Sequence, residues 1–148
     1  MVEKDAMQVS VLASSSSGNT TYIETPNHKV LVDAGMSGKR VQDLMHSIGR
    51  DLKDVDSLLV THEHRDHSSG VGVLALRYGI DVYANQPTWD AMASIIGEVP
   101  AEHKHIFEMG STLSVGDLDI ESYGVSHDAA AAQFYQFHHN NRAFAILT

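Results

Sequence analysis

The sequence predicts an α/β fold in which a β-sheet is covered by helices. Three observations support this prediction. Between residues 30 and 96, short apolar runs typical of strands alternate with segments of helical apolar periodicity. Polar loops follow several predicted strands, which is where α/β proteins carry functional residues. Beyond Gly110, short alternating patterns indicate further strands.

The first part of the chain is expected to contain three strands. Met7–Ala13 and Thr20–Glu24 read as short strands that flank the segment SSSSGN, whose small polar residues suit a tight hairpin turn. The segment PNHK then reverses the chain, and Val30–Asp33 is predicted to form the third strand.

A helix is expected after the third strand. Ser37 is a suitable N-cap for it, and Gly49 is a suitable stop. Between them, apolar residues recur at helical spacing and predict one buried face: Val41, Leu44, Met45 and Ile48.

The middle of the chain follows the order strand, helix, strand, helix. Val55–Val60 is predicted to be a strand, a helix is predicted at about residues 68–78, and the segment IDVYAN reads as the next strand. Pro87–Ile96 then predicts a helix, because proline suits a first turn and Gly97 provides a stop.

The last part of the chain predicts four short strands, in the segments STLSV, DLDIESYGV, AQFYQFHH and RAFAILT, with Asn140 and Asn141 as a two-residue hairpin turn. No linker interrupts residues 1–148, so a single domain is expected. Because the chain stops inside what reads as a buried strand, we expect this domain to be truncated.

Composition narrows the class of function. Ten Lys and Arg stand against 19 Asp and Glu, and the net charge of −9 opposes binding of this chain alone to nucleic acid or anionic lipid. No apolar run approaches the roughly 20 residues of a membrane span, and the start does not read as a signal peptide, so a cytoplasmic location is expected. Because cysteine is absent, histidine and carboxylate are the only strong metal ligands available.

The segment LLVTHEHRDHSSG, residues 58–70, concentrates imidazoles and carboxylates directly after a predicted strand. Alternate side chains of an extended segment point the same way, so His62 and His64 can converge on one point, and a tight turn can bring Asp66 and His67 to another. Two adjacent cation sites are therefore predicted. Without sulfur ligands, an open site that activates water for hydrolysis is favoured over a closed structural site.

Within that segment, THEHRDH, residues 61–67, resembles the HxHxDH signature of the metallo-β-lactamase superfamily. The resemblance covers nearly all of the chain and is most specific to the YycJ/WalJ group of bacterial metallohydrolases, in SSSSGNTTYIE, LVDAGMSGKRVQDL, VTHEHRDHSSGVGVLALRYGIDVYANQPTWDAM and VSHDAA. It implies an αβ/βα sandwich, of which this chain would be the amino-terminal half, with a mixed sheet and helices on one face. It also implies two zinc or manganese ions and, for this group, a 5′-to-3′ exonuclease action on DNA linked to mismatch repair.

The same resemblance assigns roles to particular residues. His62, His64 and His127 would hold one metal ion. Asp66 and His67 would belong to the second metal site. Asp66 is also the expected catalytic residue, as the group that orients water or accepts its proton.

Other polar residues are expected to support the metal-binding loops or to lie away from the metal site. Asp33, which ends a predicted strand, resembles the family's aspartate that supports the metal-binding loops. Glu63 and Arg65 are expected to be solvated or to brace the loop. The remaining histidines show no ligand spacing and are expected at the surface: His28, His46, His103, His105, His138 and His139.

The family pattern continues beyond the end of this sequence. It places a metal-bridging aspartate after the strand that here ends AILT, and a further histidine later, and neither is present. The second site is therefore short of ligands, so the site of His62, His64 and His127 should dominate metal binding. The missing part would also supply the sheet that packs on the first, so an exposed apolar sheet face and a homo-oligomer are expected.

These observations favour a metal-dependent hydrolase, with a phosphodiester substrate such as DNA implied by the resemblance and with the activity of this truncated chain in doubt. Two alternatives stay open: a noncatalytic metal-binding or dimerisation module, and a thioester or lactam hydrolase. Nucleic acid is an expected partner of a full-length family member, not of this acidic chain alone, and no membrane partner is expected.

Overall fold

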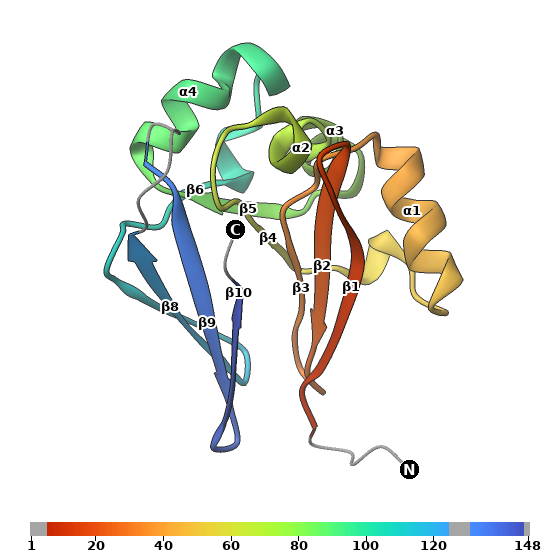
Figure 1. The fold of residues 1–148 in the computed structure, drawn as a ribbon, viewed down its shortest axis with the longest axis vertical. Helices are drawn as coiled ribbons and strands as arrows, with labels where there is room; N and C mark the ends of the chain where they lie inside the picture. The colour runs from red at the N-terminus through yellow and green to blue at the C-terminus, as the bar shows by residue number, and fades with distance from the viewer. Residues whose placement is uncertain (1–5, 125–130, 147–148) are drawn as a thin grey trace.

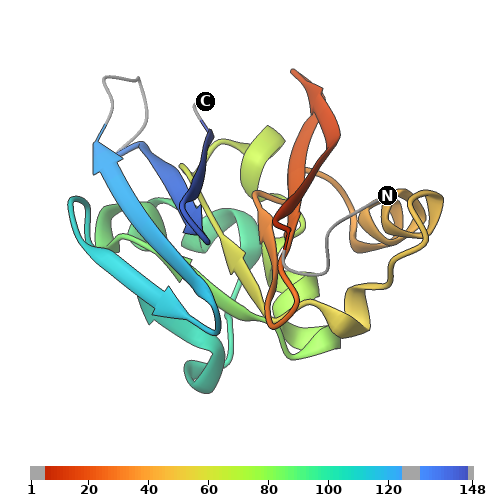
Figure 2. The same ribbon diagram turned by 90° about the horizontal axis from the view of Figure 1, so that it is seen from below.

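The computed structural model describes residues 6–124 and 131–146, which form two β-sheets packed against each other, with helices on the outer side of the first sheet (Figures 1 and 2). The first sheet has six strands, whose spatial order is also their order in the chain: β1 (Gln8–Ser15), β2 (Gly18–Glu24), β3 (Lys29–Val32), β4 (Ser57–Leu59), β5 (Asp81–Ala84) and β6 (Lys104–Ile106).

The first sheet is mixed. Strands β1, β2 and β3 pair antiparallel through tight reversals, whereas β3, β4, β5 and β6 pair parallel. Parallel neighbours need crossover connections. Helices and short 3-10 turns provide them: α1 (Gly38–Ser47), η1 (Leu52–Asp54), α2 (Arg65–Ser68), α3 (Val71–Tyr78), α4 (Gln86–Ile96) and η2 (Ala101–His103).

Local signals in the sequence set several helix ends. The Ser37 side chain accepts a hydrogen bond from the Arg40 amide at 3.2 Å and so caps α1. Asn85 caps α4 in the same way, through the Thr88 amide at 2.9 Å. Helix α3 ends at Gly79, whose φ of 64° is the left-handed conformation that glycine adopts without steric cost.

The second sheet is antiparallel and consists of β7 (Thr112–Val115), β8 (Leu118–Gly124), β9 (Gln133–His139) and β10 (Arg142–Ile146), in the spatial order β10-β9-β8-β7. Asn140 and Asn141 join β9 to β10 with φ values of 47° and 64°. Because a two-residue type I′ hairpin needs positive φ at both positions, the predicted asparagine turn is confirmed.

Two apolar cores lie on opposite faces of the first sheet, and strand alternation divides the side chains between them. Leu31 of β3 belongs to the core beneath the helices, together with residues such as Val41 and Trp89. Its neighbours Val30 and Val32 face the second sheet. Figure 2 shows this arrangement, with α1 on one side of the first sheet and the second sheet on the other. The predicted α/β class, with a mixed sheet and helices on one face, is confirmed.

The structure corrects three expectations about the elements. The helix predicted at about residues 68–78 is confirmed as α3, which begins at Val71, but the short helix α2 before it was not predicted. Strand β6 was not predicted. The second sheet was expected from a part of the protein beyond this chain, but residues 112–146 supply a sheet that packs on the first. The face of the first sheet toward β7–β10 is therefore covered by the chain itself.

None of the helices within residues 6–124 and 131–146 combines the length and the apolar character that a bilayer-spanning helix requires.

Candidate metal centre

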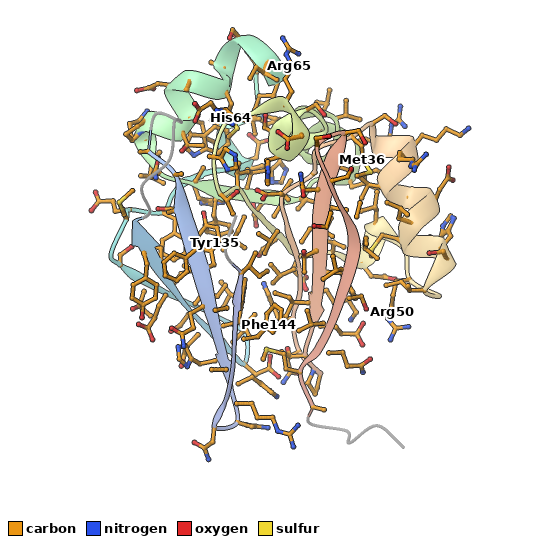
Figure 3. The ribbon with its side chains drawn as sticks, in the orientation of Figure 1. Met36, Arg50, His64, Arg65, Tyr135 and Phe144 are labelled. Atoms are coloured by element: carbon orange, nitrogen blue, oxygen red, sulfur yellow. The ribbon has the colours of Figure 1, made fainter. Side chains whose placement is uncertain are left out.

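The predicted site residues lie in loops at one end of the first sheet. Asp33 follows β3, His62 and His64 follow β4, and Asp66 and His67 lie in the short helix α2. Because β3 and β4 are parallel, their carboxyl ends meet at the same edge of the sheet. Figure 3 shows His64, which precedes α2, and Arg65, its first residue, at this end of the molecule.

Asp33 is the structural centre of this region. Its side chain is buried, and its backbone φ of 65° is unusual for a residue other than glycine. Oδ1 accepts a hydrogen bond from the Thr61 amide at 2.8 Å, and Oδ2 accepts one from the Thr61 hydroxyl at 2.7 Å. Oδ2 also lies 2.7 Å from Nδ1 of His67. Strained conformations of this kind persist where surrounding contacts fix them, and they cluster at functional sites.

These contacts determine which ring nitrogens carry protons. An ionised carboxylate only accepts hydrogen bonds, so Nδ1 of His67 must be the donor to Asp33. The Thr61 hydroxyl gives its single proton to Asp33, so it must accept from Nδ1 of His62, which lies 3.0 Å away. In both imidazoles Nε2 is then the atom with a lone pair available for a metal. Metal-bound histidines in proteins are commonly oriented in this way.

The predicted ligands lie close together. The His62 and His64 rings are 4.7 Å apart between centroids and nearly perpendicular, and the His62 and His67 rings are 4.1 Å apart. Nε2 of His67 is 3.4 Å from Oδ2 of Asp66. Two donor atoms that share a tetrahedral zinc ion at the usual bond lengths lie about 3.4 Å apart. Asp66 and His67 therefore have a separation that fits one shared ion.

The complete ligand set does not appear within the described parts of the chain. There, no group of three or more His, Asp or Glu side chains is arranged to hold a metal ion. His127, the third imidazole of the predicted first set, lies outside the described residues. The donors that are described fit a divalent metal by their chemistry, because imidazole nitrogen and carboxylate oxygen suit zinc and manganese.

In the metal-free protein, the carboxylates around His67 raise the pKa of its imidazole. Burial works to lower the pKa of His67, but the hydrogen bond and charge of Asp33, with the charge of Asp66, outweigh it, so this pKa lies above its ordinary value. Burial also raises the pKa of the Asp33 carboxyl. Because donors face both of its oxygens, the carboxylate is the form that satisfies all of its partners.

Sequence reasoning missed two contributors to this region. One is Thr61, whose hydroxyl links His62 to Asp33. The other is Asn19, in the segment SSSSGN, whose side-chain amide lies 3.0 Å from the Asp66 carbonyl and 3.2 Å from its Oδ2. Neither residue has ligand spacing, and Asn19 is 47 positions away from Asp66, so only the fold reveals these contacts.

Other expectations about polar residues are partly corrected. Arg65 is exposed, as expected, and the Glu63 carbonyl accepts a hydrogen bond from the Ser68 hydroxyl at 2.6 Å, which braces the loop. His139 was expected at the surface, but it is buried at the end of β9, where its Nδ1 donates to the Asp117 carbonyl at 2.9 Å.

Comparison with known proteins gives consistent matches. The sequence profile described as "Metallo-beta-lactamase superfamily" matches residues 15–136. The protein named exodeoxyribonuclease WalJ from Streptococcus pneumoniae serotype 2 is 55% identical over 141 residues, which cover 94% of this chain and 52% of that protein. The protein named exodeoxyribonuclease YycJ from Bacillus anthracis is 50% identical over 142 residues, 96% of this chain and 54% of that protein. The chain thus spans about half the length of these relatives.

Solved structures match in fold. A metallo-beta-lactamase from Cronobacter sakazakii superposes with a TM-score of 0.75 at 16% identity, over 88% of this chain and 58% of that one. The Rm3 metallo-beta-lactamase superposes with a TM-score of 0.72 at 18% identity, over 87% and 54%. At these identities, the likeness shows the fold alone.

Proposed function

Because the chain belongs to the metallo-beta-lactamase superfamily, we propose that it carries half of the active centre of a metal-dependent exodeoxyribonuclease. The substrate class is supported by the names of the two relatives at 50% and 55% identity. The observation that carries the proposal is the network around Asp33, which orients His62 and His67 so that Nε2 of each is the ligand atom.

Membership of the superfamily implies divalent metal ions, and we propose that the ion is zinc or manganese. His62 and His64, with His127, would hold the first ion, and Asp66 and His67 would contribute to the second. Because a third ligand is assigned only to the first set, that set should dominate metal binding by this chain.

The chain's own residues have distinct tasks in this scheme. A divalent metal, when bound, would supply Lewis acidity and lower the pKa of water toward neutrality. Asp66 is partly exposed beside His67, where its carboxylate can hold the attacking water by a hydrogen bond and accept its proton. Asp33 keeps the Nδ1 proton of His67 in place throughout, so the ring does not rotate or change tautomer.

A second candidate is a noncatalytic metal-binding or dimerisation module. The observation that favours it is that Asp66 and His67, 3.4 Å apart between Oδ2 and Nε2, can share an ion but fill only part of its coordination. In this case the ligands of this chain would bind an ion, but the chain would not catalyse a reaction.

We propose that DNA is the partner of the full-length protein and that a second copy is the partner of the isolated chain. The net charge of −9 opposes contact between this chain alone and DNA, so DNA binding belongs to the full-length protein. We propose the cytoplasm as its compartment, because the two relatives named exodeoxyribonucleases are bacterial and bacterial DNA lies there. A homo-oligomer remains our expectation for the isolated chain.

A nuclease assay with matched aspartate variants separates the two candidates. A 5′-phosphorylated DNA duplex is incubated with a full-length protein that contains this chain and with Mn²⁺ or Zn²⁺, alongside its Asp66→Ala and Asp90→Ala variants. Asp90 is an exposed carboxylate on α4 that accepts a hydrogen bond from Gln86, so its removal is a control for loss of charge. The enzyme proposal expects shortening of the duplex by wild type and Asp90→Ala but not by Asp66→Ala. Wild-type protein that binds metal yet leaves the DNA intact would support the noncatalytic module.

A further inference from the structure

We propose that Asn19 is a positioning residue that holds the carboxylate of Asp66 toward His67 and thereby raises the metal affinity of the centre. This inference rests on the proposed function, because it concerns the ligand pair assigned there. Asn19 lies at the start of β2, immediately after the turn of the β1–β2 hairpin, and its side chain contacts both the main chain and the side chain of Asp66.

The contacts of Asn19 fix the orientation of its amide group. Nδ2 lies 2.8 Å from the Ser15 carbonyl, 3.0 Å from the Asp66 carbonyl and 3.2 Å from Oδ2 of Asp66. All three partner atoms are acceptors, so the NH₂ group must face them and the amide oxygen cannot. Two amide hydrogens serve three acceptors, and the hydrogen that points to Asp66 is shared between its carbonyl and its carboxylate.

This hydrogen bond selects one orientation of the Asp66 side chain. Oδ2, the oxygen that accepts from Asn19, is also the oxygen 3.4 Å from Nε2 of His67. The Asp66 side chain is 31% exposed, so water competes for it and its carboxylate is not fixed by burial. A carboxylate oxygen has lone pairs enough to accept from Asn19 and to bind a metal at the same time.

The hairpin that carries Asn19 is itself tied to the loops of the centre. The Gly35 amide donates to the Asn19 carbonyl at 3.1 Å. A Cβ atom added at Gly35 would lie 1.7 Å from the Asp66 carbonyl oxygen, and one added at Gly18 would lie 2.7 Å from Cε of Met36. The loop after β3 is therefore tied to the hairpin through the Asn19 carbonyl and packs closely on the backbone of Asp66, so both contact partners of this loop lie next to each other.

Asn19→Asp is the most informative substitution. It keeps the shape of the side chain but replaces the donor with an acceptor, so it turns an attraction to Asp66 into repulsion without leaving a cavity. Asn19→Ala removes the contact altogether. The chain also offers a matched control, Asn27, whose amide donates to the Asp117 carboxylate at 3.3 Å beyond the other end of β2. Asn27→Ala removes a bond of the same kind away from the centre.

Calorimetric titration of the chain with Zn²⁺ tests the proposal. Loss of a group that orients a ligand typically weakens metal binding about 10- to 100-fold. We expect Asn19→Ala to weaken the lower-affinity binding event, assigned to Asp66 and His67, about tenfold. Asn19→Asp should weaken that event further, and Asn27→Ala should leave it unchanged. In an Asp66→Ala background, Asn19→Ala should change the remaining affinity less than about twofold, because the group through which it acts is gone. Equal effects of Asn19→Ala in both backgrounds would overturn the proposal.

A second readout needs no metal. In the metal-free protein, Asp66→Ala should shift the side-chain amide resonances of Asn19 in a ¹H–¹⁵N spectrum and leave those of Asn27 in place. Unshifted Asn19 resonances would exclude the contact. A wild-type chain that fails to bind Zn²⁺ and Mn²⁺ would contradict the proposed function, whereas this spectrum would still decide whether Asn19 holds Asp66.

Discussion

At the scale of single residues, Asp33 does the most to organise the centre. Its two oxygens accept hydrogen bonds from Thr61 and His67, and through the Thr61 hydroxyl it also determines the tautomer of His62. One buried carboxylate thus sets the tautomers of two predicted metal ligands, His62 and His67, without itself being a predicted ligand. Its positive φ shows that the chain accepts local strain to keep it there.

Asn in place of Asp33 should weaken metal binding and also destabilise the fold. The shape is kept, and one oxygen can still accept from the Thr61 amide, but an NH₂ group would then face Nδ1 of His67. The ring would have to move its proton to Nε2, the ligand atom. We expect metal affinity to fall at least tenfold and the free energy of unfolding to fall by about 1–3 kcal/mol. Zinc titration and urea unfolding of Asp33→Asn measure the two effects. Wild-type affinity in this variant would refute the assigned tautomers.

The predicted ligands could be read from the sequence because their spacing is local. An extended segment followed by a tight turn brings His62, His64, Asp66 and His67 to one place whatever the rest of the fold does. Asn19 and Thr61 could not be read in this way. Asn19 reaches the centre only because β1 and β2 form the edge of the first sheet beside α2. Thr61 gives no signal in the sequence, because a threonine next to a histidine does not by itself indicate a hydrogen bond between them.

At the scale of elements, an ion pair joins the end of β2 to the segment after α1. Nε of Arg50 lies 2.7 Å from Oε1 of Glu24 and Nη2 lies 3.1 Å from Oε2, and the Tyr22 hydroxyl donates to the same carboxylate at 2.7 Å. Burial alone would raise the pKa of Glu24, but the bonds from Arg50 and Tyr22 outweigh it and lower this pKa below 4.5.

The stability that this carboxylate contributes should depend on pH in a defined direction. Because the folded-state pKa is lower than the unfolded one, the contribution is complete above pH 4.5 and is lost as pH falls through the folded-state pKa. Glu24→Gln should cost about 1–2 kcal/mol at pH 7 and progressively less as pH falls through the lowered pKa of Glu24. Urea unfolding of both proteins between pH 7 and pH 3 provides the comparison. A cost that grows on acidification would contradict the assignment.

The boundaries of the elements show where sequence signals are sufficient. Ser37 and Gly79 act locally, so the start of α1 and the end of α3 followed from the sequence. The break at Gly70 did not, because its cause is tertiary: the Gly70 amide donates to the Ala34 carbonyl at 2.7 Å, and a Cβ there would lie 2.1 Å from the Met36 carbonyl oxygen. Strand β6 was missed because its sequence, KHI, is short and polar at the edge of the sheet.

At the scale of the whole molecule, the misplaced second sheet has a physical explanation. Alternation in residues 112–146 predicts strands with one apolar face, but it does not say which surface that face covers. Phe137 and Ile120 could have faced a partner, and in the structure they pack against the first sheet of their own chain. Tyr135 fixes this packing, because its hydroxyl donates to the Val60 carbonyl at 2.6 Å, just before the loop that carries His62 and His64. Figure 3 shows Tyr135 on β9 beneath the centre.

One exposed apolar site lies at the opening between the two sheets. Each of β1 and β10 pairs with one neighbour only among the described strands, and a cavity of about 210 Å³ separates them. Its lining includes Val11, which is 62% exposed, together with Phe144 and Ile146 from β10. A second copy of the chain that covers this opening would bury Val11.

Self-association should therefore depend on Val11. Sedimentation of the wild-type chain is expected to show a dimer that weakens on dilution, and Val11→Lys should shift the chain to the monomer, because burial of a lysine charge without a partner is costly. Leu76→Lys is a matched control, because Leu76 is 72% exposed but lies on α3, away from the cavity. Equal behaviour of the two variants would place the association elsewhere.

The central claim is that imidazoles of this chain hold a divalent metal. Its most direct test is the zinc content and zinc affinity of the purified chain, measured beside His62→Ala, His127→Ala and the control His103→Ala, whose ring instead contacts Asp81 at 3.1 Å. The account predicts that wild type and His103→Ala bind zinc and that His62→Ala and His127→Ala lose it. Unchanged zinc binding in both His62→Ala and His127→Ala would contradict the account.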